Sequence, residues 1–131
     1  MIDHENELFN IIATALRATY DGIYVANEYV SQPPRFPAVM IDEMDNSVDE
    51  RAIDTGAIEN AANVMYQVDV YSNLIQGKKA QAKAIIASID EQMSRMRFVR
   101  TFKNPVQNMN DSTIYRITAR YRRKITDEEE L

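Results

Sequence analysis

The chain has no cysteine, a single histidine and only three glycines among its 131 residues. The absence of cysteine excludes a disulfide scaffold, a thiolate zinc site and cysteine-based catalysis. The only histidine, His4, lies in an N-terminus that is expected to be frayed, so it is a poor base for a Ser-His-Asp triad, and one histidine cannot form a histidine-rich metal site. Gly77 stands alone before Lys78 and Lys79, without the further glycines that a phosphate-binding loop or a dinucleotide turn needs. We therefore expect no enzyme activity, no cofactor and no bound metal.

Long apolar runs are missing as well. No stretch approaches the roughly 18 to 20 apolar residues of a membrane-spanning helix. The acidic start of the chain lacks the basic and then apolar regions of a secretory signal. A hydrophobic fraction of 45% and a charged fraction of 27% are typical of a soluble globular protein. The length predicts one domain over residues 1–131, with no membrane contact.

The net charge of −5 is unevenly distributed along the chain. Residues 1–60 hold 12 acidic and 3 basic residues, a net charge of −9. Residues 61–131 hold 8 acidic and 12 basic residues, a net charge of +4. This division fits two oppositely charged faces of one small domain. It also fits charge complementarity between copies in a ring built by head-to-tail contacts.

The stretch from Ala62 to Met96 is predicted to be the centre of the fold. Apolar side chains alternate from Val64 to Val70, which is the period of a strand with one buried face. After Asn73 and Gly77, apolar residues recur at steps of three and four, which predicts an amphipathic helix. The stripe consists of Ala82, Ile85, Ile86, Ile89, Met93 and Met96.

The remaining segments predict a helix over Glu5–Tyr20, which ends at Gly22, and four further strands. These strands are expected at Ile23–Val30, Ala38–Met44, Phe98–Lys103 and Thr113–Lys124. Three prolines within Ser31–Pro37 predict a rigid connection, although a proline-rich ligand for SH3-type domains is an alternative. The expected fold is α+β: two layers, with a mainly antiparallel sheet of four to five strands and both helices on one face.

Two acidic segments interrupt this pattern. Residues 45–61 are predicted to form a long acidic loop, either a hairpin tip or an arm that becomes ordered against a neighbouring subunit. Residues 126–131 are predicted to form an acidic, frayed C-terminal tail. Asp42, Glu43 and Asp45 could hold a hard cation, but their spacing matches no calcium loop, so solvated acids are the preferred interpretation.

Basic residues of the last strand, from Arg116 to Lys124, raise the possibility of nucleic-acid binding. Strand alternation places Tyr115 and Tyr121 on the face opposite Arg116 and Arg120, so stacking and phosphate contacts would not share a surface. The acidic pI of about 4.9 is also unusual for a nucleic-acid binder. A solvated or intersubunit basic strand is the preferred interpretation.

Three stretches carry a resemblance to a known family. They are Phe36–Glu43, Val68–Asn73 before the Lys/Ala-rich helix, and Tyr115–Tyr121. Their order and spacing, over about residues 5–125, resemble the tail-completion (tail terminator) proteins of long-tailed bacteriophages, especially those of Gram-positive hosts. The resemblance implies a structural virion protein that forms a hexameric ring at the head–tail junction after assembly in the host cytoplasm.

The partners implied by this resemblance are further copies of the chain, the tail-tube protein and the head-closure or connector protein. DNA would pass through the lumen without specific binding, and residues 45–61 would either line the lumen or reach a neighbouring subunit. The candidate subunit or partner interface residues are Asp49, Glu50, Arg51, Asp54, Gln67, Asp69, Tyr71, Arg116, Arg120 and Arg122. The alternatives are another neck or tail-tube component, or a non-viral adaptor domain that binds a protein partner.

Overall fold

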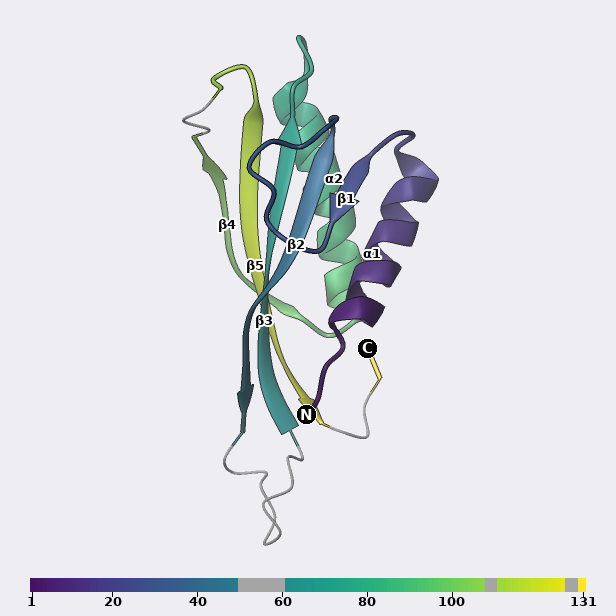
Figure 1. The fold of residues 1–131 in the computed structure, drawn as a ribbon, viewed down its shortest axis with the longest axis vertical. Helices are drawn as coiled ribbons and strands as arrows, with labels where there is room; N and C mark the ends of the chain where they lie inside the picture. The colour runs from purple at the N-terminus through teal and green to yellow at the C-terminus, as the bar shows by residue number, and fades with distance from the viewer. Residues whose placement is uncertain (50–60, 108–110, 127–129) are drawn as a thin grey trace, which may run out of the picture.

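A computed structural model describes residues 1–49, 61–107, 111–126 and 130–131. Two helices and five strands follow one another along the chain (Figure 1). In chain order they are α1 (Glu5–Thr19), β1 (Tyr24–Ala26), β2 (Ala38–Val48), β3 (Ala61–Ser72), α2 (Lys78–Arg95), β4 (Val99–Val106) and β5 (Tyr115–Thr126). None of the helices in these ranges is long and apolar enough to span a membrane.

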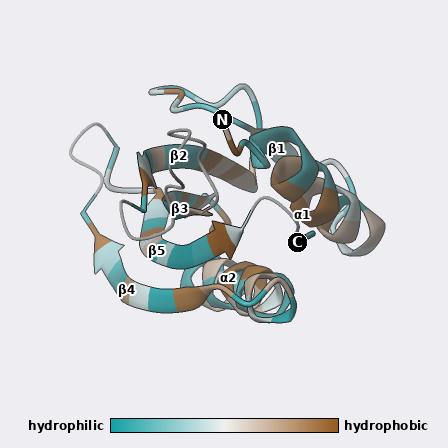
Figure 2. Cartoon of the chain, turned by 90° about the horizontal axis from the view of Figure 1, so that it is seen from below, coloured by the Kyte–Doolittle hydropathy of each residue, from teal (hydrophilic) through white to brown (hydrophobic). Residues whose placement is uncertain are grey.

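The five strands form one sheet in the order β1-β2-β3-β5-β4. Only β1 and β2 run parallel, and every other neighbouring pair is antiparallel. Seen end-on, the sheet is curved and both helices lie on the same side of it (Figure 2). The predicted α+β two-layer fold is therefore confirmed, with the helix-covered side as the inner face and the opposite side as the outer face.

The core lies between the inner face of the sheet and the two helices. β3 and β5 contribute alternating side chains, and α2 contributes the predicted stripe, in which Ile85 and Ile89 are fully buried. The rings of Tyr66 and Phe98 meet edge to face with their centroids 5.7 Å apart. Tyr121, also buried, donates a hydrogen bond of 2.9 Å from its hydroxyl to Asp90 on α2, which fixes the helix against the strand.

The helix ends follow local chemistry. Asp3 accepts a 3.1 Å hydrogen bond from the backbone N–H of Glu5 at the start of α1, and Gly22 has the predicted left-handed conformation with φ of 73°. α2 ends at Arg95 with Met96 as its cap, as predicted. Its capping residue was not predicted, because Arg97 takes the left-handed position that glycine usually occupies, with φ of 63°. Its N–H and that of Phe98 donate to the carbonyls of Ser94 and Met93, which satisfies the last turn of the helix.

Several predicted boundaries are wrong. β1 is only three residues long, because its pairing with β2 ends at Ala26 opposite Met40. The predicted loop at 45–61 begins too early, since pairing with β3 extends β2 to Val48 across a bulge between Glu43 and Asp45; residues 50–60 lie outside the described residues. β4 likewise continues beyond its predicted end at Lys103 to Val106.

The predicted tail at 126–131 is also partly wrong. Thr126 belongs to β5, where it pairs with Ala61 of β3. Leu131 is half-buried against the core, so this last residue is not frayed. Residues 127–129 lie outside the described residues.

The outer face of the sheet is covered at one end. The connection between β1 and β2 crosses in front of the strands on the side away from α2 (Figure 1). Val30 and Phe36 from this connection pack against a small buried cluster of Ala38, Met40 and Tyr71. The prolines therefore do more than link two strands, because the segment that contains them shields part of the outer face from water.

The helix stripe predicts a large difference between two isoleucines. Ile89→Ala should lower the free energy of unfolding by about 2–5 kcal/mol, because it leaves a cavity where the side chain is fully buried. Ile75→Ala is the matched control, since Ile75 is fully exposed and should change stability by less than about 0.5 kcal/mol. Urea unfolding followed by circular dichroism measures both, and equal effects would contradict the assignment of the core.

Candidate assembly surfaces

A polar network lies on the outer face of the sheet, centred on Asp69 of β3. Its Oδ1 atom accepts hydrogen bonds from Arg116 Nη2 at 2.9 Å, from Arg116 Nε at 3.1 Å and from Thr118 Oγ1 at 2.5 Å. Its Oδ2 atom accepts one from Gln67 at 3.1 Å. The Asp69 side chain is only 4% exposed, so these hydrogen bonds replace the ones to water that the carboxylate loses on burial.

The network continues into two contacts between arginines and aromatic rings. Arg116 lies over Tyr71 with its guanidinium carbon 5.4 Å from the ring centroid, and Arg120 lies over Phe102 at 5.6 Å. Arg120 also donates to the side-chain oxygen of Gln67 at 3.0 Å. Five of the candidate interface residues, drawn from β3 and β5, are thus brought together: Gln67, Asp69, Tyr71, Arg116 and Arg120.

The expectation that this whole group faces a partner is wrong for Asp69 and Tyr71. Both are buried, because the arginines and the connection between β1 and β2 cover them. Burial raises the pKa of Tyr71 above its ordinary range, so the ring stays neutral beside Arg116. Sequence alternation placed these residues on the correct face, but it could not show that a distant segment covers that face.

The other candidate interface residues have different surroundings. Arg122 and Arg120 are exposed on β5, whereas Asp49 is half-buried at the end of β2 and forms an ion pair with Lys124. Three further residues, Glu50, Arg51 and Asp54, lie outside the described residues. Arg120 and Arg122 therefore place exposed basic charge on the outer face.

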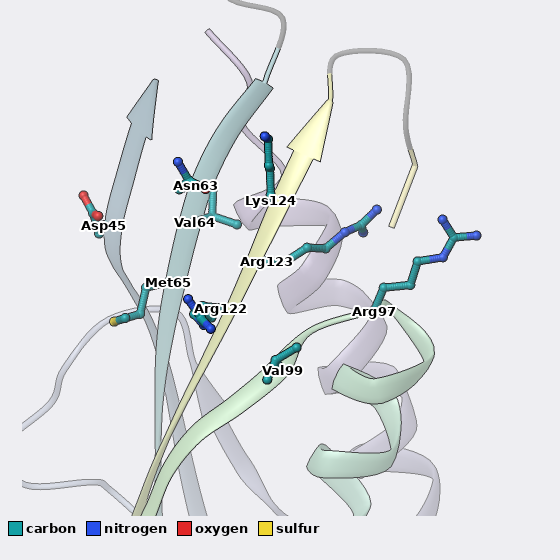
Figure 3. A pocket seen from close by; sticks show the side chains of 9 residues that line it. All are labelled: Asp45, Asn63, Val64, Met65, Arg97, Val99, Arg122, Arg123 and Lys124. Atoms are coloured by element: carbon teal, nitrogen blue, oxygen red, sulfur yellow. The ribbon is translucent and has the colours of Figure 1, made fainter. Parts of the chain in front are cut away.

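A cleft of about 470 Å³ opens at the lower end of β5, where β4 diverges from it. Figure 3 shows Arg122 and Arg123 on opposite sides of β5, as strand alternation requires, with Met65 of β3 on the same side as Arg122. The lining residues are Asp45, Asn63, Val64, Met65, Arg97, Val99, Arg122, Arg123 and Lys124. With four basic residues and one acidic residue at its walls, the cleft suits an acidic protein surface better than a neutral small molecule.

Arg123 is a residue whose role the sequence did not reveal. It lies on the inner face, 7% exposed, and donates from Nη1 to the carbonyl of Met96 at 2.9 Å. Its Nη2 atom lies 3.5 Å from the carbonyl oxygen of Glu130. Arg123 therefore joins the end of α2 to the C-terminal residues, which is a structural role.

Three carboxyl groups meet near the start of α1. Oxygen atoms of Asp3, Glu5 and Glu43 lie within 4.8 Å of one another, and Oε1 of Glu43 is buried without a hydrogen-bond partner. Burial raises the pKa of Glu43 to about 7, helped by a hydrogen bond with Glu5 and by the negative charges of Glu5 and Asp3. Asn46 opposes this shift by a hydrogen bond to Glu43, and it also donates to the carbonyl of Ile2 at 2.8 Å. A proton held by Glu43 lessens the repulsion within this group.

Comparisons with known proteins place the chain more specifically. A family model described as "Tail completion protein gp17" matches residues 11–131, almost the whole chain. No curated protein matches. A chain from a solved structure titled "Virion of native gene transfer agent (GTA) particle" superposes with a TM-score of 0.56 at 18% identity, covering 88% of this chain and 91% of that one. At 18% identity this match is evidence for the fold alone.

The polar network predicts that Asp69→Asn destabilises the protein. The variant keeps the shape of the side chain but loses the charge that Arg116 and Thr118 bind, so unfolding should require about 1–3 kcal/mol less free energy. Asp21→Asn, at an exposed position after α1, is the control and should change little. Thermal unfolding at neutral pH measures both variants; no difference between them would refute a structural role for the network.

The cluster of carboxyl groups of Asp3, Glu5 and Glu43 predicts that the stability of the protein depends on pH. Because the folded protein binds a proton on Glu43 that the unfolded chain releases, stability should fall as pH rises from about 4.5 through about 7. Glu43→Gln should remove this part of the fall and make the protein more stable than the wild type above pH 7. Urea midpoints at pH 5 and pH 8 provide the measurement, with exposed Glu28→Gln as the control. The assignment fails if both variants keep the wild-type pH profile.

Proposed function

The chain belongs to the family of tail completion protein gp17, and from this membership we propose that copies of it form a ring on the end of a phage tail tube. Members of this family are structural proteins of the virion tail, so the chain's role is assembly with other tail or head proteins. The ring stops the growth of the tube and then joins the tail to the head connector. The match over residues 11–131 is the observation that carries this proposal.

The ring contains six copies, and DNA crosses its lumen without specific binding. Two features support assembly by head-to-tail contacts. The two halves of the chain are oppositely charged, and the exposed arginines lie on β5 whereas acidic residues lie on β2. The partners are the tail-tube protein on one side and the head-closure or connector protein on the other. Residues 45–49 lie at the far end of β2, where acidic side chains would face the lumen or a neighbouring copy.

Removal of the gene from the phage tests the proposal. A cap that limits the tube predicts tails of abnormal length, together with filled heads that fail to join them; a wild-type gene supplied in trans should restore both. Electron microscopy of lysates measures tail length and attachment. Normal virions would refute the proposal, complete absence of tubes would indicate a tube subunit, and unattached tails of normal length would indicate a head-closure protein.

A further inference from the structure

Two strand edges have no neighbouring strand in the part of the chain that the structure describes. β1 pairs with β2 only at Ala38–Met40, so the rest of β2 is paired with β3 alone. We call Ile41–Val48 the β2 edge. At the other end of the sheet β4 is paired with β5 alone, and we call Val99–Asn104 the β4 edge. One molecule thus presents two different edges that point in opposite directions.

Both edges carry exposed apolar side chains. Met44 and Val48 on the β2 edge are 48% and 42% exposed, and Val99 and Phe102 on the β4 edge are 57% and 38% exposed. They make up half of the eight large apolar side chains exposed among the described residues. Single exposed apolar residues are common on protein surfaces, whereas apolar residues gathered at one site usually mark a surface that becomes buried on association.

The two edges are also opposite in charge. On its outer side the β2 edge carries Asp42 and Asp45, level with Gln67 and Met65 of β3, and the edge contains no basic residue. Glu43 is not part of this charge, because it packs against Asp3 and Glu5 at the start of α1. Beside the β4 edge, β5 presents exposed arginines at 120 and 122, and neither β4 nor β5 contains an acidic residue. Arg100 of the β4 edge is already paired with Asp90 of α2, so the arginines of β5 carry the charge available to a partner. Electrostatic complementarity of this kind favours one partner and one orientation.

We propose that the β4 edge of one copy docks on the β2 edge of a second copy, with the four apolar side chains in contact and Asp42 and Asp45 facing Arg120 and Arg122. This contact rests on the proposed ring and specifies how it is built. It joins two different surfaces of the same chain, so it repeats around a closed ring and leaves no unpaired copy. Within one copy, Lys124 near the end of β5 already forms an ion pair with Asp49 after β2, which is the same pairing of basic β5 with acidic β2.

Side chains, and not a continuous backbone ladder, make this contact. Each edge contains a bulge, between Glu43 and Asp45 on β2 and between Arg100 and Phe102 on β4. Pro105, which follows the β4 edge, has no N–H to donate. Bulges and edge proline interrupt ladder hydrogen bonds, and they prevent pairing with unrelated strands. Specificity therefore comes from the apolar and charged side chains.

The register of the sheet indicates which residues meet. Val99 is level with Arg122 of β5, which is level with Met65 of β3, which is level with Asp45 of β2. Copies related by rotation alone lie at the same height in a ring. Val99 of one copy therefore meets the next copy near Asp45 and its neighbour Met44. Since β4 runs antiparallel to β2, the two edges run antiparallel in the contact.

The width of the sheet agrees with a ring around DNA. Four strands, β2, β3, β5 and β4, separate the two edges, so at about 4.8 Å for each strand one copy is about 19 Å wide, and six copies give a circumference of about 115 Å and a radius of about 18 Å at the backbone. A ring of this radius has room for a DNA duplex after its inner side chains are counted. Edge-to-edge docking thus produces the size that the proposed function requires.

Disulfide cross-linking tests the contact directly, because the chain contains no cysteine of its own. The double variant Met44→Cys with Val99→Cys, incorporated into phage tails and oxidised, should form a ladder of linked chains with a loss of most of the monomer band. Met44→Cys with Phe102→Cys should do the same if β4 is shifted along β2, because Phe102 is level with Arg120, two positions along β5 from the partner of Val99. Disulfides form only between Cα atoms closer than about 7 Å, so a ladder locates both edges.

The controls separate this contact from the proposed function. Each single-cysteine variant should remain without a ladder, as should Ile75→Cys with Val99→Cys, whose first site is exposed but lies on the turn before α2. If the double variants are present in tails and neither forms linked chains, the edge contact is wrong while the capping role stands. If the protein is absent from tails and gene removal leaves virions normal, the proposed function fails and the contact with it.

Discussion

The packing of α2 against the inner face of β3 and β5 is the interaction on which the rest of the structure depends. It buries the isoleucines of α2 against alternating side chains of the two strands, and the hydrogen bond from Tyr121 to Asp90 fixes the helix position. Burial of this kind stabilises a domain by roughly 25 cal/mol for each Å² of apolar surface removed from water. With one face of the sheet committed to the core, its outer face and its edges remain available for contacts, together with the exposed sides of the helices.

The outer face divides into a covered part and an open part. Tyr71 lies under the connection between β1 and β2, and beside it the hydrogen bonds of Asp69 to Arg116 and Thr118 make a satisfied polar layer. Beyond this layer the arginines of β5 and the apolar residues of β4 remain exposed. The network thus serves the proposed assembly indirectly, because it holds Arg120 and its neighbours in place on a stiff sheet.

The sequence predicts the α+β class, both helices and the centre of the sheet, because strong periodicity from Val64 to Met93 reports burial directly. It does not predict the ends of β2 and β4, which are set by pairing with strands distant in the chain. It also misplaces Asp69 and Tyr71 on an open surface, since the covering of Tyr71 by Val30 and Phe36 and the bonding of Asp69 to Arg116 and Thr118 are tertiary effects. The edge contact could not be found from sequence, because it depends on which strands have no neighbour.

The central claim is that head-to-tail docking closes into a ring at the tail end. Native mass spectrometry of the complex released from purified tails tests it most directly. Six chains of 15.1 kDa predict a single species of about 91 kDa. A stable dimer, or an open series of masses without a limit, would contradict the account.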